Sequence, residues 1–285
     1  MSLARTAFKF RGPMAPVFTA FKDDPAQTVN YEVIDSYAKW LKERGVDAVL
    51  VNGTTGEGMS LSVAERKATA EEWFKACKKY QMTQMVQVGG APFVDVAELA
   101  RHAENLGVDA ILCLPELYFK PKTEQDLVKY LANVAKNCPK TPLLYYHIPK
   151  NTLVDLSMPK FIDLAEKEIS NFIGIKYTSN DLAMGCSCLK ENRFIFLGGD
   201  AILCGALAQG FDSTILTTLN IYPEYTFEIF KSMKNGDFAQ ARKKQKELLA
   251  IIDRILQEGD WVQAMKMEFN RVFHTNIGKT RTPLF

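Results

Sequence analysis

The sequence predicts an α/β fold, a (β/α)8 TIM barrel with a C-terminal helical extension. Short apolar runs alternate eight times with amphipathic helical patterns up to about residue 235. The runs are apolar at consecutive positions, which is typical of parallel strands that are covered on both faces. Eight strand-then-helix units are the number that closes a TIM barrel.

The predicted elements follow one another in a regular order. The strands are residues 14–18, 48–51, 85–88, 110–114, 143–146, 172–176, 194–197 and 213–216. The helices that alternate with them are residues 31–44, 62–79, 94–106, 124–137, 159–167, 182–189, 201–209 and 224–233. Gly45, Gly107 and Gly210 lie where a helical pattern gives way to the next strand. We expect these glycines to end their helices in the left-handed conformation.

Two further helical patterns, residues 238–257 and 261–273, follow the eighth unit. We expect them to pack on the flank of the barrel. Because no linker or low-complexity stretch interrupts the chain, it is predicted to be a single domain, 1–285, with the barrel at about 12–235 and the C-terminal helices at about 236–285. A doubly wound open sheet is the structural alternative, but its usual glycine-rich fingerprint is missing after the first strand.

Composition excludes several classes of function. With 35 Lys and Arg against 33 Asp and Glu, the chain has no strong field, so nucleic acid and acidic membranes are not expected as partners. No apolar run approaches the roughly 20 residues that span a bilayer. The six cysteines form no C-x-x-C pair and the three histidines form no H-E-x-x-H motif. We therefore expect a cytoplasmic protein with reduced thiols, no metal and no cofactor.

The active site of a TIM barrel lies at the C-terminal ends of its strands. Tyr146 closes one predicted strand and Lys176 closes the next. A lysine carried into a barrel mouth loses hydration, which favours the neutral amine that can attack a carbonyl and form a Schiff base. A neighbouring phenol can then move protons. Taken alone, the pair also fits a non-catalytic interpretation, in which the lysine extends to solvent and the tyrosine belongs to the core.

A glycine-rich loop, residues 52–58, follows the second predicted strand. Its glycines let backbone N–H groups approach an anion, and the hydroxyls of Thr54 and Thr55 add donors. A carboxylate is the natural ligand, although the loop taken alone also fits a tight turn. Together with an amine and a phenol at the same mouth, the loop predicts binding of a 2-oxo acid as an imine, with cleavage or formation of a bond to its C3 carbon.

Three motifs, in the right strand order, give the chain a resemblance that covers nearly its whole length. The motifs are Gly53-Thr54-Thr55-Gly56-Glu57, Tyr146-His147-Ile148-Pro149 and Gly174-Ile175-Lys176-Tyr177-Thr178. The chain resembles the pyruvate-dependent class I aldolases that include N-acetylneuraminate lyase and dihydrodipicolinate synthase. Its motifs look most like those of the animal N-acetylneuraminate lyases. The resemblance implies a carbon–carbon lyase and a homotetramer.

The resemblance also implies roles for individual residues. Lys176 is the expected Schiff-base lysine and Tyr146 the proton donor and acceptor. Thr54 and Thr55 are expected to hold the pyruvate carboxylate, and Thr54 can also relay a proton. The remaining expected substrate contacts are Thr178, Gly198, Asp200, Ile215 and Thr217. Tyr118 corresponds, one residue out of step, to an aromatic side chain that family tetramers insert into a neighbouring active site.

Departures from the family pattern concern the far end of the substrate. Neuraminate lyases place a Glu where this chain has Ala201, a Gly where it has Leu216 and a Tyr where it has Leu219. These changes are expected to add apolar bulk and to remove a partner for the sugar tail. Dihydrodipicolinate synthases place an Arg near Lys150, and a lysine cannot reproduce its two parallel hydrogen bonds.

Several functions stay open at this point. The leading prediction is an N-acetylneuraminate lyase-like enzyme, and the nearest alternatives are a 2-keto-3-deoxy sugar acid aldolase and a dihydrodipicolinate synthase-like enzyme. A catalytically slow, pyruvate-binding regulatory protein on the same barrel is an alternative outside enzymes. A phosphate-binding barrel that uses Gly198 and Gly199 is another, because barrels often bind phosphate after the seventh strand.

Overall fold

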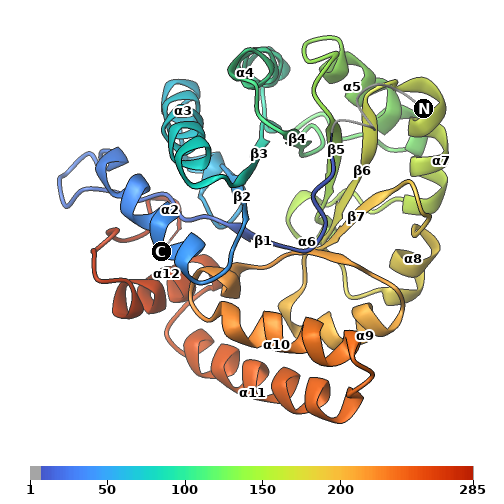
Figure 1. Cartoon of the computed structure of the whole chain (residues 1–285). Helices are drawn as coiled ribbons and strands as arrows, with labels where there is room; N and C mark the ends of the chain where they lie inside the picture. The colour runs from blue at the N-terminus through green and yellow to red at the C-terminus, as the bar shows by residue number, and fades with distance from the viewer. Residues whose placement is uncertain (1–7, 285) are drawn as a thin grey trace.

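The computed structural model describes residues 8–284 and contains a closed barrel of eight parallel strands (Figure 1). Each strand pairs with the next along the chain, and β8 pairs with β1 to close the barrel. The strands are β1 Pro13–Pro16, β2 Ala48–Val51, β3 Thr83–Gln87, β4 Ala110–Cys113, β5 Leu143–His147, β6 Phe172–Tyr177, β7 Phe194–Leu197 and β8 Ser213–Ile215. The predicted (β/α)8 fold is confirmed.

Helices surround the barrel as an outer ring (Figure 1). They are α2 Ile34–Glu43, α3 Val63–Tyr80, α4 Phe93–Leu106, α5 Glu124–Ala135, α7 Met158–Glu168, α8 Leu182–Ser187, α9 Leu203–Ala208 and α10 Pro223–Lys234. Short helical turns lie in the loops: η1 Tyr31–Val33, η2 Gly58–Ser60, α6 Pro149–Thr152, η3 Asp200–Ile202 and η4 Thr217–Asn220. The predicted left-handed ends are confirmed, with φ of +83° at Gly45, +80° at Gly107 and +100° at Gly210.

Element boundaries differ from the prediction by a few residues. The predicted helices 31–44 and 201–209 each begin as a 3-10 turn before the α-helix starts. The turn α6 was not predicted, although Pro149 at its first position is a known way to begin a helix. These differences lie between the strands and the main helices, where the local backbone conformation depends on hydrogen bonds that the sequence pattern does not show.

The core consists of two layers, one inside the barrel and one between the strands and the helices. Side chains alternate between the layers along each strand. Tyr146 belongs to the inner layer and Tyr145 to the outer one, and Ile215 lies inside whereas Leu216 lies outside. This alternation decides which side chains can reach the mouth of the barrel.

The C-terminal helices α11 Phe238–Leu256 and α12 Trp261–Val272 pack on one side of the ring, where α12 lies beside α2 (Figure 1). Phe269 of α12 contacts Tyr37 of α2, with ring centres 4.7 Å apart. The chain then runs back over the loop that follows β1, where the Phe21 N–H donates to the Ile277 carbonyl at 2.9 Å. Helix α12 is thereby held close to the β1 and β2 loops. Within residues 8–284 no helix has the length and apolar character needed to cross a membrane.

Candidate active site

Lys176 and Tyr146 lie side by side at the ends of β6 and β5, where the two residues pair directly in the strand register. The Lys176 side-chain nitrogen donates a hydrogen bond to the Tyr146 hydroxyl at 3.0 Å and lies 4.2 Å from the centre of the same ring. Both residues are almost fully buried. The Thr54 hydroxyl, from the loop after β2, lies 3.0 Å from the Tyr146 hydroxyl. The structure thus brings the three predicted catalytic residues into one hydrogen-bonded chain.

The loop that carries Thr54 and Thr55 is a tight turn that needs glycine. A Cβ on Gly58 would lie 2.0 Å from the Asn52 carbonyl oxygen, and one on Gly56 would lie 2.8 Å from the Val17 carbonyl oxygen. No other residue type fits at those distances. The turn presents Thr55 to η4, where its hydroxyl lies 2.9 Å from the hydroxyl of Thr217.

Gly198 leaves the space that Thr178 occupies beside Lys176. A Cβ on Gly198 would lie 2.1 Å from the Thr178 hydroxyl oxygen and 3.3 Å from the Lys176 Cε. The Thr178 hydroxyl is buried and has no hydrogen-bond partner within residues 8–284. A polar group in that position is available to a ligand, since an unsatisfied buried hydroxyl costs free energy.

Asp200 joins the loops after β7 and β8. Its carboxylate accepts hydrogen bonds from the Thr218 backbone N–H at 3.2 Å and from the Thr218 hydroxyl at 2.5 Å. Burial raises the pKa of Asp200, and the bonds from Thr218 oppose that rise. Ile215 is the last residue of β8, and its side chain belongs to the inner layer of the core. Asp200 and Ile215 therefore lie in the region predicted, although their contact with substrate stays a prediction.

Two residues that were predicted to fill the substrate pocket do not reach it. Leu216 and Leu219 are fully buried in the outer layer, between the strands and the helices. The prediction that they add apolar bulk at the mouth is wrong, because strand alternation turns Leu216 away once Ile215 points inward. Ala201 is exposed, and its side chain supplies no partner for a ligand.

Tyr118 lies apart from the lysine, on the loop after β4. It is 78% exposed, and its nearest aromatic neighbour is Phe119, which is 82% exposed with its ring centre 4.9 Å away. No contact joins Tyr118 to Lys176, Tyr146 or Thr54 among the described residues. The role of Tyr118 at the active site of a neighbouring chain stays a prediction.

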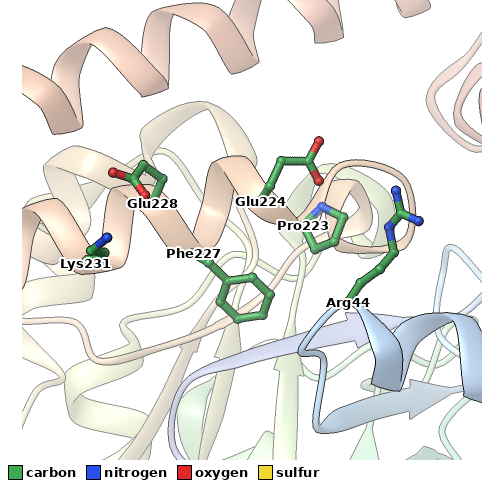
Figure 2. A pocket seen from close by; sticks show the side chains of 6 residues that line it. All are labelled: Arg44, Pro223, Glu224, Phe227, Glu228 and Lys231. Atoms are coloured by element: carbon green, nitrogen blue, oxygen red, sulfur yellow. The ribbon is translucent and has the colours of Figure 1, made fainter.

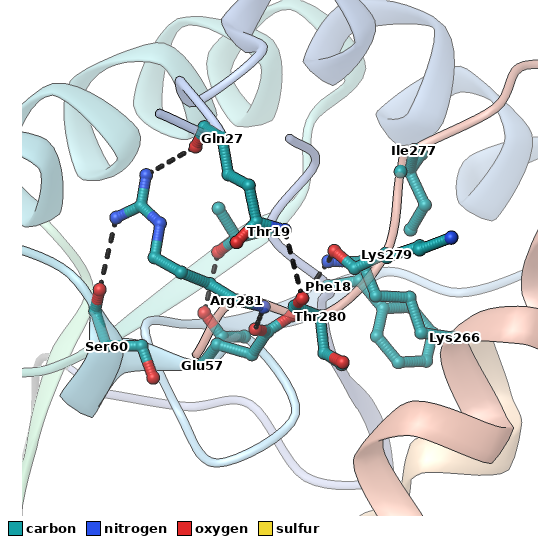
Figure 3. Close-up of polar contacts among 12 residues, drawn as sticks. Phe18, Thr19, Gln27, Glu57, Ser60, Lys266, Ile277, Lys279, Thr280 and Arg281 are labelled. Carbon is teal, nitrogen blue, oxygen red and sulfur yellow. Dashed lines mark hydrogen bonds and ion pairs between the residues drawn. The ribbon is translucent and has the colours of Figure 1, made fainter. Parts of the chain in front are cut away.

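Sequence reasoning missed the contribution of α12. Lys266 donates to the Glu57 carboxylate at 2.7 Å, and the Arg281 backbone N–H donates to the other Glu57 oxygen at 2.7 Å (Figure 3). The Trp261 indole N–H donates to the Thr217 hydroxyl at 3.2 Å. Glu57 stands in the predicted glycine-rich motif, but its partners lie more than 200 positions along the chain, and no local pattern indicates such a pairing.

One surface hollow lies away from these residues. It is lined by Arg44, Pro223, Glu224, Phe227, Glu228 and Lys231, between the end of α2 and the outer side of α10 (Figure 2). It contains none of the predicted site residues. Within residues 8–284 no three His, Cys, Asp or Glu side chains gather as the ligands of a metal ion would.

Comparison with known proteins gives a consistent result. The model of the dihydrodipicolinate synthetase family matches residues 9–285. The chain is 33% identical to the N-acetylneuraminate lyase of Homo sapiens, over 97% of this chain and 87% of the relative, and 34% identical to that of Danio rerio, over 97% and 91%.

Solved structures agree with the sequence relatives. Proteus mirabilis N-acetylneuraminate lyase superimposes with a TM-score of 0.91 at 33% identity, covering 97% of this chain and 93% of the other. The N-acetylneuraminate lyase of Aliivibrio salmonicida superimposes with a TM-score of 0.90 at 36% identity, covering 97% of this chain and 91% of the other. A protein of the dihydrodipicolinic acid synthase family from E. coli K12, whose structure contains pyruvate, has a TM-score of 0.82 at 26% identity, covering 91% and 87%.

Proposed function

The chain belongs to the dihydrodipicolinate synthetase family and is a carbon–carbon lyase, a class I pyruvate-dependent aldolase of the N-acetylneuraminate lyase type, and on that premise we propose how its residues carry out the reaction. The observation that carries the proposal is the hydrogen-bonded chain of Lys176, Tyr146 and Thr54 at the mouth of the barrel. It joins a buried amine to a phenol and an alcohol that can exchange protons.

In the cleavage direction, the neutral Lys176 amine attacks the C2 carbonyl of a 2-oxo acid, and loss of water forms an imine. The protonated imine draws the electrons of the C3–C4 bond toward nitrogen. Tyr146 gives its phenol proton to the departing water, and the resulting phenolate accepts the proton of the C4 hydroxyl as the C3–C4 bond breaks and an aldehyde leaves. The resulting enamine takes a proton at C3, and water hydrolyses the imine to release pyruvate and regenerate the amine. The reverse sequence forms the carbon–carbon bond.

The substrate carboxylate is proposed to lie at the loop after β2. Thr54 and Thr55 supply hydroxyl donors there, and loop backbone N–H groups add to them. Ile215 forms an apolar wall for the three-carbon pyruvyl unit. Thr178, Gly198 and Asp200 border the path of the longer tail, and the unpaired Thr178 hydroxyl supports a polar contact with it. Thr217 is the remaining member of the proposed site.

The proposed substrate is a hydroxylated 2-oxo acid, either N-acetylneuraminate or a shorter 2-keto-3-deoxy sugar acid. Ala201 favours the shorter acid, because it offers the tail no hydrogen-bond partner. A dihydrodipicolinate synthase-like reaction is less well supported, since Lys150 is exposed on α6. Pyruvate release from a panel of 2-oxo acids tests the proposal. If no member of the panel yields pyruvate and no aldehyde condenses with it, the proposed reaction is wrong.

We also propose a cytoplasmic homotetramer built from single-domain chains. The six cysteines are all free thiols, as is usual in a reducing compartment. Tyr118, Phe119 and Leu153 are 78%, 82% and 76% exposed and line one surface hollow. Large exposed apolar side chains of this kind mark interaction sites. Light scattering should give four chains per particle for the native protein and fewer for Phe119→Asp. A monomeric native protein would contradict the proposal.

A further inference from the structure

We propose that Trp261 of α12 is a positioning residue that makes Thr55 a hydrogen-bond donor toward the substrate carboxylate. The inference rests on the proposed function, which places that carboxylate at Thr55. Three side chains from three parts of the chain form a line. The Trp261 indole nitrogen lies 3.2 Å from the Thr217 hydroxyl oxygen, which lies 2.9 Å from the Thr55 hydroxyl oxygen.

Chemistry fixes the direction of the first hydrogen bond in this line and favours one direction for the second. An indole N–H can only donate, and a hydroxyl has one proton to give. Thr217 therefore accepts from Trp261. Thr217 keeps a second lone pair, so its bond with Thr55 can run in either direction. The indole N–H occupies one lone pair of Thr217 and so favours the direction in which Thr217 donates its proton to Thr55. In that direction Thr55 accepts from Thr217, and its own proton is free to point toward a ligand.

A free Thr55 proton favours binding of a carboxylate, because an ionised carboxylate only accepts hydrogen bonds. Without the indole this preference is lost, and the Thr55–Thr217 bond runs more often in the reverse direction. Thr55 would then donate its proton to Thr217 and present only lone pairs to the ligand. Thr55 and Thr217 are 4% and 5% exposed, so bulk water cannot easily correct the orientation. The indole thus favours one orientation of the pair of hydroxyls.

Helix α12 is held in place at a second point on the same loop. Lys266, five positions after Trp261, forms the ion pair with Glu57, and the Arg281 guanidinium bonds to the Ser60 and Gln27 carbonyls (Figure 3). Thr55 and Glu57 are two positions apart in the sequence. Helix α12 therefore bonds directly to the loop through Lys266 and reaches Thr55 through Thr217, which keeps the indole close to Thr217.

The test uses Trp261→Phe, which keeps an aromatic ring for packing and removes the N–H. Borohydride trapping at Lys176 should show a rise of about five- to tenfold in the pyruvate concentration for half-saturation. Pyruvamide is the second probe. Its amide can donate as well as accept, so its half-saturation should change less. Trp40→Phe is the matched control, because the Trp40 indole donates to the Asn220 carbonyl, outside this line.

A double-mutant cycle checks that Trp261 acts through Thr217. Trp261→Phe should have no further effect in a Thr217→Val background, whereas in a Thr217→Ser background, which keeps the hydroxyl, Trp261→Phe should still raise the pyruvate concentration for half-saturation. Equal losses for pyruvate and pyruvamide, or additive effects in the cycle, would overturn the positioning role while leaving Lys176 trapping intact. If the native protein traps no pyruvate at Lys176, the proposed function fails and the inference fails with it.

Discussion

Lys176 and Lys266 are 4% and 1% exposed, and their side-chain nitrogens lie 4.2 Å and 4.3 Å from the ring centres of Tyr146 and Phe21. Their polar partners differ. Lys266 forms an ion pair with Glu57 at 2.7 Å and donates to the Lys279 carbonyl at 3.0 Å. Lys176 donates to a phenol, and no carboxylate in the described part of the chain lies at ion-pair distance from it.

The difference in polar partners leads us to expect different roles for the two lysines. A carboxylate partner stabilises the ammonium and fixes it in place, so the nitrogen lone pair is not available. Burial lowers the pKa of Lys266 to about 8, and Glu57 opposes that fall. A phenol partner gives no such compensating charge, and it can exchange a proton with the amine or the substrate. We therefore expect loss of Lys176 to affect chemistry and loss of Lys266 to affect stability.

The largest expected effect is that of Lys176→Ala. Without the amine no imine can form, so turnover should fall by at least about 10⁴-fold. The thermal midpoint should stay close to that of the native protein. Mass spectrometry after borohydride treatment with pyruvate measures the reduced adduct on the peptide that contains Lys176. An adduct that persists in full in the variant would remove Lys176 from the mechanism.

Tyr146→Phe tests the partner that distinguishes the two lysines. The variant keeps the ring beside Lys176 but removes the hydroxyl that bonds to Lys176 and Thr54. We expect kcat to fall by about 10²- to 10⁴-fold, because a general acid–base is lost. Steady-state kinetics on the best substrate measures it, and a thermal melt controls for folding. A kcat within a few-fold of the native value contradicts the proton role.

Lys266→Met should instead lower the stability of the fold. It leaves the Glu57 carboxylate buried without its ammonium partner, which is expected to lower the free energy of unfolding by about 3–5 kcal/mol. Urea denaturation measures the change. The double variant Glu57→Gln with Lys266→Met removes both charges and should regain much of the loss. If Lys266→Met alone is as stable as the native protein, the ion pair does not hold the loop.

A third buried base, His147, extends the comparison, because neither ring nitrogen has a hydrogen-bond partner within residues 8–284. Its ring stacks on Tyr177 with centres 5.0 Å apart. Burial lowers the pKa of His147 to about 4. The unfolded chain takes up a proton below about pH 6.5 and the folded chain does not, so stability is lost as pH falls from about 6.5 toward 4.

His147→Phe keeps a ring for stacking and removes this titration. Its unfolding free energy should therefore fall less steeply than that of the native protein over the same pH range, by about 2–3 kcal/mol in total. Urea denaturation at pH 7, 6, 5 and 4 measures both proteins. Parallel curves for the two proteins would show that His147 does not contribute to acid sensitivity.

The contrast between the two lysines also explains what could be predicted from the sequence. Lys176 closes a predicted strand, and strand order alone places it at the barrel mouth beside Tyr146. Lys266 lies inside an amphipathic helix, and its partner Glu57 is 209 positions away, so no local pattern reveals the pair. Leu216 shows a different limit. Leu216 lies one position after Ile215, the last residue of β8, and that single position moves its side chain from the inner layer to the outer; the motif comparison did not distinguish the two layers.

The smallest expected effect concerns the far end of the substrate, where this chain has Ala201 in place of the Glu of the neuraminate lyase pattern. Of the three departures from the neuraminate lyase pattern, Ala201 alone is exposed; Leu216 and Leu219 lie in the outer core. Ala201→Glu should raise kcat/KM for N-acetylneuraminate by about three- to tenfold, since a carboxylate can accept hydrogen bonds from a polyol. Ala201→Gln, which has similar length and no charge, is the matched control. Shorter 2-keto-3-deoxy acids should be the better substrates of the native chain and should change little in either variant. If N-acetylneuraminate is already the best substrate of the native chain, Ala201 does not limit the tail.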